Sequence, residues 1–454
     1  MLFWLEAHGL VVLAGLLVAT TAIVMLQQRR SPQATIAWLM FLVVVPYVAI
    51  PAFAVMGFRK RLQSGPAAPF QTAAAPRPGE HAPQIERMLC RYGLGAASEG
   101  NRFSLQTGGE ESWAALTELV ADATTSLDVT LYALGNDPVG RAFCAMLANK
   151  ARQGVAVRVI LDRFGSLWRP RRALRELTGA GGEVRLHSPI LNSPSGGNLN
   201  LRIHRKMVIA DGARVWSGGR NVAEEYLGPE PVAGRWHDLS FVVDGPATVA
   251  FSGIFISDWK AANGRMESRA APIPREKGTS KLQIVPAGPD VSEDPLHDAL
   301  VFACHAAARR VWIVTPYYLP TPALSEALAI AARRGVDVRL LIPAKSNQRL
   351  ADLARGAWLR DLEDSGCRIH LHPEMVHAKA VLADGLAFTG SANLDARSLL
   401  LNFEMAALLF NNEDVEILHR WAEGLLAEAP VGIRPAGRIR RAVEALFRLG
   451  SPIL

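Results

Sequence analysis

The most continuous hydrophobic pattern in the chain lies at its N-terminus, where two long apolar segments follow each other. The first runs without a charge from Gly9 to Leu26, and the second runs from Ala34 to Phe58. A hydrocarbon core of about 30 Å requires about 20 helical residues, so each segment is long enough to span a bilayer. Pro46 and Pro51 would break a helix in water but are tolerated inside membrane spans. The pattern predicts a transmembrane hairpin over residues 1–62.

Two alternatives compete with this interpretation of the N-terminus. A cleavable signal peptide is disfavoured because Glu6, and no basic cluster, precedes the first segment and no cleavage site stands out. A pair of buried core helices is the other alternative. Two basic residues, Arg29 and Arg30, separate the segments, and three follow the second one at positions 59–61. Counting these charges places the main domain on the cytoplasmic side.

Beyond a segment rich in Ala, Pro, Gly and Ser at residues 63–88, which we expect to be a linker, helical and strand patterns alternate. They do so twice, because ARQGVAVRVILDRFGS at Ala151 is echoed by ARRGVDVRLLIPAKSN at Ala332. Each copy reads as a helix end, a glycine and a buried strand. Alternating strands and helices predict an α/β fold with a mainly parallel central sheet. We expect two such halves, residues 89–270 and 271–454, to form a pseudo-dimer.

The end of the chain carries a third kind of pattern. Ile439, Val443, Leu446 and Phe447 fall on one face of a predicted amphipathic helix. Such helices usually pack on their own domain. The alternative is a helix that lies on a membrane surface.

Charge and cysteine content narrow the range of partners. The 454-residue chain has a formal net charge of +7, which suits work near an anionic phospholipid bilayer or a nucleic acid. A basic surface that only keeps the protein soluble is the alternative. The four cysteines are scattered, without a C-x-x-C pair or clustered histidines, so the sequence indicates neither a disulfide framework nor a zinc site.

The same histidine–lysine–aspartate pattern occurs once in each half. It begins at His204 in HRKMVIADG and at His377 in HAKAVLADG. Residues i and i+2 of a strand project to the same face, so each lysine, Lys206 or Lys379, points the same way as its histidine. Because the lysines would repel a cation, the pattern does not indicate a metal cage. It suits a phosphodiester bound between two imidazoles.

Further residues are repeated behind each histidine motif. Both halves continue with a glycine-containing segment, GGRN or GSAN, and glycines let backbone N–H groups approach an anion. The candidate phosphate-binding residues are Asn221, Asn393 and Ser391. Gly219 stands in the first half where the second half has Ser391, so the hydroxyl donor is expected on one side only.

Two histidines with opposite tasks predict a double displacement at phosphorus. One unprotonated imidazole forms a phosphohistidine, while the other protonates the leaving alcohol and later deprotonates the incoming one. The lysines and asparagines would stabilise the phosphoryl oxygens, and one such donor is typically worth about 10²–10³ in rate. Each imidazole also needs an acid to fix its tautomer. The candidates are Asp238, 34 residues after His204, and Glu404, 27 residues after His377.

The aspartates of the two motifs allow two interpretations. Asp211 and Asp384 each directly precede a glycine. This position is typical of a turn, so a structural role competes with direct chemistry. Both aspartates are kept as candidate catalytic residues beside the histidines and lysines.

These residues resemble the phospholipase D superfamily, and the wider pattern is similar to its bacterial cardiolipin synthase branch. The resemblance rests on the paired H-x-K-x4-D motifs, the N-terminal hairpin, TPYYLP from Thr315, GSANLDARSLLLNFE from Gly390, and GGRNVAEEYLG followed by WHD. It implies two phospholipase D-like α/β/α sandwich halves and a multi-pass protein of the bacterial inner membrane. It further implies phosphatidyl transfer between two phosphatidylglycerol molecules with release of glycerol, without a metal or organic cofactor. The family assigns the first histidine, here His204, as nucleophile and the second, His377, as acid and base.

Three alternatives to this function remain open at the level of sequence. A phospholipase D-type phosphodiesterase would use the same site with water as acceptor. A nucleic-acid phosphodiesterase would fit the charge, but the two predicted spans and the lipid-family resemblance count against it, so no nucleic-acid partner is expected. A non-catalytic membrane scaffold would leave the duplicated residues idle. The sequence does not determine the oligomeric state.

Overall fold

The computed structural model describes residues 2–27, 32–56, 78–79, 82–187, 201–265, 275–291 and 293–450. They divide into a helical N-terminal unit within residues 1–61 and an α/β body. The predicted linker over residues 63–88 lies mostly outside the described residues, as do the basic residues that flank the second apolar segment.

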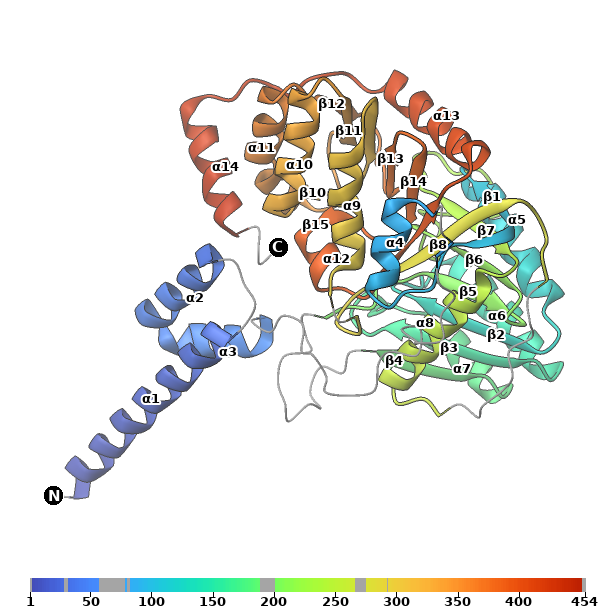
Figure 1. Ribbon diagram of the computed structural model, residues 1–454. Coiled ribbons are helices and arrows are strands. Elements are labelled where there is room, and N and C mark those ends of the chain that lie inside the picture. The colour runs from blue at the N-terminus through green and yellow to red at the C-terminus, as the bar shows by residue number, and fades with distance from the viewer. Residues whose placement is uncertain are drawn as a thin grey trace. The chain divides into compact units, whose positions relative to one another are not determined.

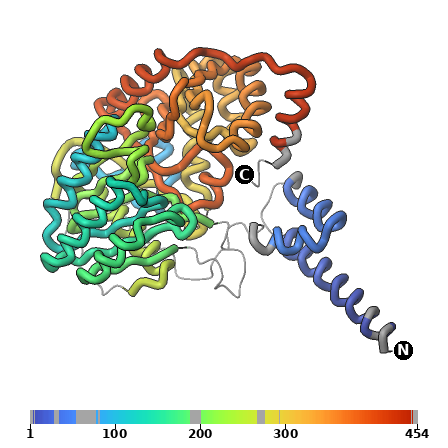
Figure 2. The backbone as a smooth tube through the Cα atoms, turned by 180° about the vertical axis from the view of Figure 1, so that it is seen from behind, coloured from blue at the N-terminus to red at the C-terminus, as the bar shows by residue number. Residues whose placement is uncertain are grey.

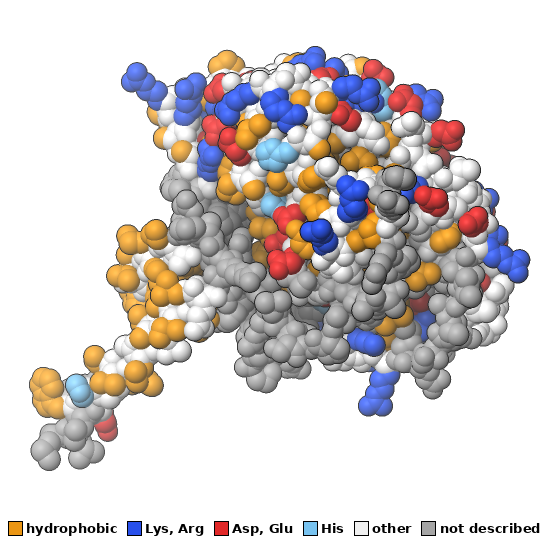
Figure 3. Space-filling view, viewed as in Figure 1, with side chains coloured by type: hydrophobic (Ala, Val, Ile, Leu, Met, Phe, Trp, Pro, Cys, Tyr) orange, Lys and Arg blue, Asp and Glu red, His pale blue; other side chains and the backbone are white. Residues whose placement is uncertain are grey.

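The described residues of the N-terminal unit form the apolar helices α1 (Leu2–Gln27), α2 (Pro32–Val44) and α3 (Pro46–Met56). Hydrophobic side chains make up much of the face that the space-filling view shows (Figure 3). Helix α1 is long and apolar enough to cross a membrane over His8–Gln27. By this length criterion it is the one candidate span among the described residues.

The structure does not confirm the second spanning helix. The segment is divided at Val45, and a residue before a proline is disfavoured in the helical conformation. The rings of Trp38 in α2 and Phe53 in α3 lie 5.4 Å apart between centroids. In one straight helix these residues would be separated by about 22 Å, so α2 and α3 fold back on each other.

The α/β body is built on one sheet, which has fourteen strands within the described residues (Figure 1). Its order is β12-β11-β9-β13-β14-β16-β8-β1-β7-β6-β5-β2-β3-β4. The strands of the first half are β1 (Ser98–Gln106), β2 (Ser126–Leu131), β3 (Ala156–Asp162), β4 (Glu183–His187), β5 (Met207–Ala210), β6 (Arg214–Gly218) and β7 (Ser240–Asp244). Those of the second half are β8 (Ser280–Ala287), β9 (Arg310–Val314), β11 (Asp337–Pro343), β12 (Arg368–His372), β13 (Ala380–Ala383), β14 (Leu386–Gly390) and β16 (Glu404–Leu409). A separate small sheet pairs β10 (Tyr318–Leu319) with β15 (Leu394–Asp395).

The order of strands confirms two α/β halves. Read outward from the central β1–β8 pair, the first half runs β1, β7, β6, β5, β2, β3, β4, and the second runs β8, β16, β14, β13, β9, β11, β12. The halves therefore repeat one topology strand for strand, and Figure 2 shows them as two lobes of the chain.

The prediction of a mainly parallel sheet was wrong. In the fourteen-stranded sheet of the described residues, parallel pairing is confined to β2–β3–β4 and to β9–β11–β12, and the strands between them pair antiparallel. The cause is the short connection after each histidine motif. A tight turn at Asp211 joins β5 to β6 and another at Asp384 joins β13 to β14, and such turns allow only antiparallel pairing.

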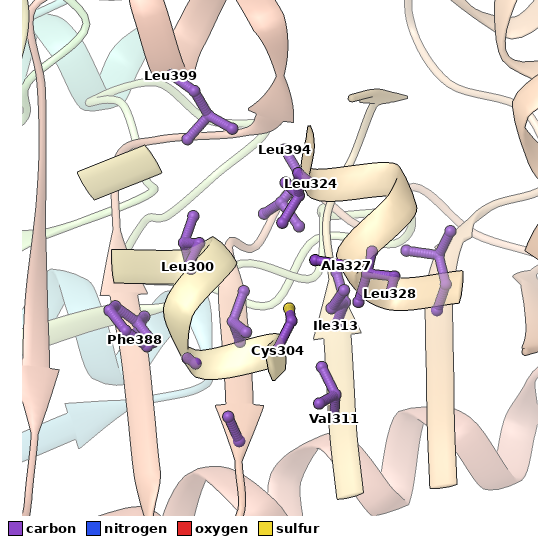
Figure 4. Packing of buried hydrophobic residues seen from close by; sticks show 14 of the residues in the cluster. Leu300, Cys304, Val311, Ile313, Leu324, Ala327, Leu328, Phe388, Leu394 and Leu399 are labelled. Carbon is purple, nitrogen blue, oxygen red and sulfur yellow. The ribbon is translucent and has the colours of Figure 1, made fainter. Parts of the chain in front are cut away.

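Helices cover both halves of the sheet. In the first half these are α5 (Gly109–Asp122), α6 (Pro138–Arg152), α7 (Arg171–Gly179) and α8 (Thr248–Ala261). In the second they are α9 (Pro295–Ala306), α10 (Pro322–Arg333), α11 (Arg349–Asp364), α12 (Ala396–Leu400), α13 (Asn412–Glu428) and α14 (Arg438–Gly450). Figure 4 shows the second-half core, where Leu300, Leu328 and Phe388 pack between helices and strands. Helix α4 (Gln84–Arg91) belongs to this core through Ile85 and Leu89.

The C-terminal helix α14 packs on the body. Glu444 is buried and forms an ion pair with Arg360 of α11 at 2.9 Å. Ile439 and Val443, predicted on the packed face, are instead exposed. A buried, paired glutamate turns the helix so that part of its apolar face meets solvent.

Candidate active site

Each histidine motif immediately precedes a central strand of its half, and the backbone ties it to the other half. His204 and Lys206 lie just before β5, and His377 and Lys379 lie just before β13. The N–H of His204 donates to the carbonyl of Phe403 at 2.9 Å, and the N–H of His377 donates to the carbonyl of His237 at 2.7 Å. The site therefore lies where the two halves meet, as the repeated motifs predict.

The carboxylates pair with the imidazoles in a crossed manner. Nδ1 of His204 lies 2.8 Å from Oε1 of Glu404, and Nδ1 of His377 lies 2.7 Å from Oδ2 of Asp238. Both acids were predicted as partners, but each was assigned to the histidine nearer in sequence. That pairing was wrong, because Glu404 at the start of β16 and Asp238 just before β7 each contact the histidine of the other half.

The difference between Gly219 and Ser391 follows from the length of the acid in each half. A Cβ at Gly219 would lie 2.2 Å from Oδ1 of Asp238, so only glycine leaves room for the shorter acid. In the second half the hydroxyl of Ser391 donates to Glu404 at 2.5 Å and accepts from the N–H of Met405 at 3.1 Å. The Ser391 hydroxyl, predicted as a phosphate donor, is thus engaged in orienting Glu404.

The two lysines are buried beside the histidines. Nζ of Lys206 donates to the carbonyl of His204 at 2.6 Å, and Nζ of Lys379 lies 2.8 Å from Nδ1 and 3.3 Å from Nε2 of His377. Burial lowers the pKa of Lys206 well below its ordinary value and lowers the pKa of Lys379 to about 8. An anion bound between the two lysines would offset part of the desolvation penalty, because it stabilises the protonated form of each amine.

The charges act on one another across the halves. Burial lowers the pKa of His377 to about 3, helped by the positive charges of Lys379 and Lys206. Burial also lowers the pKa of His204, and the positive charges of Lys206 and Lys379 lower it further. Burial alone would raise the pKa of Asp238, but Lys379 and His377 outweigh it and hold that pKa well below its ordinary value. These shifts favour an ionised Asp238 and neutral imidazoles in the resting site.

Aromatic rings complete the walls around both imidazoles. The ring of Tyr132 lies 4.8 Å from that of His204, and the rings of Tyr226 and Trp236 lie 5.0 Å and 5.6 Å from that of His377. Tyr226 and Trp236 were not predicted as site residues, although Trp236 lies two residues before Asp238. Their rings shield His377 from water.

The asparagines occupy equivalent places beyond β6 and β14. Asn221 is buried and its Oδ1 accepts the N–H of Ala133 at 3.2 Å. Asn393 is likewise buried. Both remain candidates to donate a side-chain N–H to a bound phosphate.

The two aspartates of the motifs lie at the far ends of β5 and β13 from the histidines. Asp211 accepts the backbone N–H groups of residues 124–126 at 2.7–2.9 Å. Asp384 accepts those of residues 308–310 at 2.8–3.0 Å. Both adopt positive φ, 54° and 51°. This geometry supports the structural alternative: each aspartate ties a turn to the start of β2 or β9.

Arg205 is a buried residue of the site region that sequence reasoning missed. It lies between His204 and Lys206, is fully buried, and contacts Asp258 at 2.5 Å and Asp290 at 3.0 Å. It also donates to the carbonyl of Glu404 at 3.1 Å. The sequence did contain a clue to a special role for Arg205, because the equivalent position of the second half is Ala378.

The arrangement provides two imidazoles, two ammonium groups and two orienting carboxylates for an anionic group held between the halves. The described residues contain no group of three or more His, Cys, Asp or Glu side chains that could hold a metal ion. The chemistry open to such a site is transfer of a phosphorus-centred group.

Comparisons with known proteins agree with this class of site. A family model described as cardiolipin synthase, PLD-like domain, matches residues 116–259 and 301–426. The chain is 29% identical to the cardiolipin synthase of Geobacillus thermodenitrificans (strain NG80-2), covering 98% of this chain and 93% of that protein. It is 30% identical to cardiolipin synthase A of Pseudomonas syringae pv. syringae (strain B728a), covering 85% and 84% respectively. The chain belongs to the cardiolipin synthase family with phospholipase D-like domains.

A solved structure supports the fold independently. The phosphatidylserine synthase of Haemophilus influenzae Rd KW20 matches with a TM-score of 0.57 over 78% of this chain and 95% of that chain. At 13% identity this likeness concerns the fold alone.

Proposed function

We propose that the protein is a membrane-anchored cardiolipin synthase that transfers a phosphatidyl group from one phosphatidylglycerol to another and releases glycerol. The observation that carries this proposal is the crossed pairing of His204 with Glu404 and of His377 with Asp238. Because each acid reaches an imidazole of the other half, the pairing supports one site shared by both imidazoles and two buried lysines. Membership of the cardiolipin synthase family supports a phospholipid substrate.

In the first step, Nε2 of His204 attacks the phosphorus of the donor lipid. The P–O bond to glycerol breaks, and His377 donates a proton to the leaving oxygen. Glu404 holds Nδ1 of His204 and thereby presents Nε2 to the phosphorus. Among the described residues, none forms a hydrogen bond to Nε2 of His204, whereas Nε2 of His377 has Nζ of Lys379 at 3.3 Å. This difference favours His204 as the nucleophile.

In the second step, His377 removes the proton from a hydroxyl of the second phosphatidylglycerol. That oxygen attacks the phosphohistidine, the P–N bond breaks, and His204 is restored. Lys206, Lys379, Asn221 and Asn393 stabilise the phosphoryl oxygens in both steps. Because a bound phosphodiester adds a negative charge beside His377, it raises the pKa of that imidazole from its low resting value and makes it an acid.

The N-terminal unit is proposed to anchor the enzyme in the bacterial inner membrane. Helix α1 spans the bilayer, and the folded-back pair α2 and α3 enters it as a second apolar element. The α/β body lies on the cytoplasmic side, as the basic residues at positions 59–61 favour. Protease protection in sealed vesicles tests this sidedness.

Incubation of the purified full chain with headgroup-labelled phosphatidylglycerol tests the activity. Cardiolipin together with free labelled glycerol is the expected result. Phosphatidic acid as the sole lipid product would contradict synthase activity and would indicate a phospholipase D-type hydrolase instead. His204→Ala and His377→Ala are the matched inactive controls, and near-normal turnover in either variant would contradict the two-imidazole scheme.

A further inference from the structure

Two surface segments beside the site expose large hydrophobic side chains together with positive charge. The first, here called the Trp168 loop, comprises residues 163–169 between β3 and α7. Its Phe164, Leu167 and Trp168 are exposed by 57%, 42% and 84%. Exposed apolar side chains that gather on one loop mark an interaction surface more often than scattered ones do.

The second surface segment occupies the equivalent place in the other half. The Leu350 segment comprises residues 345–353, from the end of β11 into α11, and exposes Leu350 by 54% and Leu353 by 45%. Both segments follow the strand that lies two places outward from the histidine motif of their half. Strand β3 runs parallel to β2, and β5 runs antiparallel to it; the same holds for β11, β9 and β13. The end of β3 or β11 therefore lies beside the start of β5 or β13, where the histidine of that half is located.

Contacts connect the Trp168 loop to the catalytic region. Asp162 accepts the N–H groups of Phe164 at 2.9 Å and Gly165 at 2.8 Å, and its other oxygen accepts the N–H of Ile203 at 3.2 Å. Ile203 directly precedes His204. The hydroxyl of Ser166 donates to the carbonyl of Tyr132 at 2.9 Å, and the ring of Tyr132 packs on His204. The loop is thus held in a defined shape beside the nucleophile.

The charge on these segments is mainly positive. The Trp168 loop and the start of α7 carry Arg163, Arg169 and Arg171, and the pKa of Arg169 is lowered by burial and by the other two positive charges. The Leu350 segment carries exposed Lys345 and Arg349. Its one acid, Asp352, forms an ion pair with Arg355 at 3.0 Å. The free surface of both segments is therefore basic as well as apolar.

We propose that the Trp168 loop and the Leu350 segment dock the α/β body onto the surface of an anionic phospholipid bilayer. Aromatic and leucine side chains enter the boundary between headgroups and acyl chains, and the arginine and lysine side chains meet lipid phosphates. This inference rests on the proposed function, since it names how the lipid-transferring site meets its membrane. It assigns to these segments a task separate from that of the N-terminal helices, namely presenting the site to lipid headgroups.

Depth-dependent fluorescence quenching tests the docking without requiring turnover. The full chain would be reconstituted in phosphatidylglycerol-containing nanodiscs with a polarity-sensitive probe at Trp168→Cys or Leu350→Cys, in a Cys90→Ser background. Val249→Cys is the matched control, because Val249 is exposed by 53% but follows β7, which ends away from the site. Brominated acyl chains should quench the first two positions roughly threefold more than the control. Equal quenching at all three positions would overturn the proposal, as would a probe shift that appears without lipid through contact between protein copies.

Kinetics provide a second test. The triple variant Phe164→Ser, Leu167→Ser, Trp168→Ser should raise the KM for bilayer phosphatidylglycerol about tenfold, which corresponds to about 1.4 kcal/mol. Its kcat, and its turnover of a soluble short-chain phosphatidylglycerol, should stay unchanged, as should all values for Val249→Ser. Trp168→Ser alone serves if the triple variant melts early. An unchanged bilayer KM in both would overturn the docking role, whereas absence of cardiolipin formation by the unaltered enzyme would overturn the proposed function.

Discussion

Nδ1 of His204, in the first half of the chain, lies 2.8 Å from Oε1 of Glu404 in the second half. The reciprocal pair joins His377 to Asp238 of the first half at 2.7 Å. Neither half can therefore orient its own imidazole. The functional unit is the folded pair of halves, even though each half carries a complete copy of the motif.

The crossed pairing predicts which imidazole each acid supports. Glu404→Gln should slow formation of the phosphatidyl-enzyme by roughly 10²–10⁴-fold, because the amide stabilises the wrong tautomer of His204. Asp238→Asn should act through His377, on proton transfer to and from the alcohols. Trapping of labelled phosphatidyl-enzyme in single-turnover experiments separates the two. Greater loss of trapping in Asp238→Asn than in Glu404→Gln would contradict the crossed assignment.

Gly219 is predicted to be sensitive to the smallest substitution. Gly219→Ala should lower kcat by about 10² or more, because the added Cβ would meet Oδ1 of Asp238 at 2.2 Å and displace the acid. Ser391→Ala removes one hydrogen bond from Glu404 and should cost only about tenfold. Gly179→Ala is the control, since a Cβ there meets nothing within 4 Å. Steady-state turnover with a thermal melt of each variant checks the expectation, and full activity in Gly219→Ala would refute it.

The pKa of Lys379 is expected to set the pH above which activity falls. Burial lowers its pKa to about 8, so kcat/KM should fall as pH rises through that value and the ammonium group loses its charge. In Lys379→Arg the residual activity should persist to higher pH, because guanidinium stays charged. The effect of this lysine on the free energy of unfolding should have the opposite dependence on pH. The unfolded chain keeps this proton up to about pH 10.4, so the free energy of unfolding should rise from about pH 8 to that value. A pH–rate profile that stays flat to pH 10 would exclude this role.

Asp211 is expected to matter for stability more than for chemistry. Asp211→Ala leaves three backbone N–H groups without their acceptor and should lower the free energy of unfolding by about 1–3 kcal/mol. Backbone hydrogen bonds outweigh the effect of burial and lower the pKa of this carboxyl to about 2. Its contribution is therefore present above about pH 3.9 and lost as pH falls towards 2. Denaturant unfolding at two pH values, with kcat per folded molecule, checks this. A kcat lowered by 10² in fully folded protein would restore a catalytic role.

Many of the candidate site residues were predictable because they belong to short motifs that occur twice in the sequence. His204, Lys206 and their counterparts stand in short local patterns; their spacing predicted a strand face, and the structure has them just before β5 and β13. The pairing of the acids was not predictable, because Glu404 and His204 lie 200 residues apart and only the packing of the halves brings them together. The same holds for Tyr226 and Trp236, whose rings reach His377 from outside its motif.

The prediction of a mainly parallel sheet was wrong, and that of a second spanning helix was not confirmed, where local conformation competed with a global pattern. The alternation of helices and strands indicated the α/β halves correctly, but the turns at Asp211 and Asp384 made the central strands antiparallel. Apolar length indicated a second membrane span, yet the break before Pro46 produced two short helices. In both cases a few residues with special backbone requirements overrode a pattern averaged over many.

By itself the sequence determined the chemical groups, the duplication and the family, because these depend on residue identity and local spacing. Only the tertiary structure decided which acid serves which histidine, why one half carries glycine where the other carries serine, and which exposed side chains stand beside the site. Each of these depends on contacts between segments far apart in the chain. Such contacts follow from the packing of whole elements and not from any one stretch of residues.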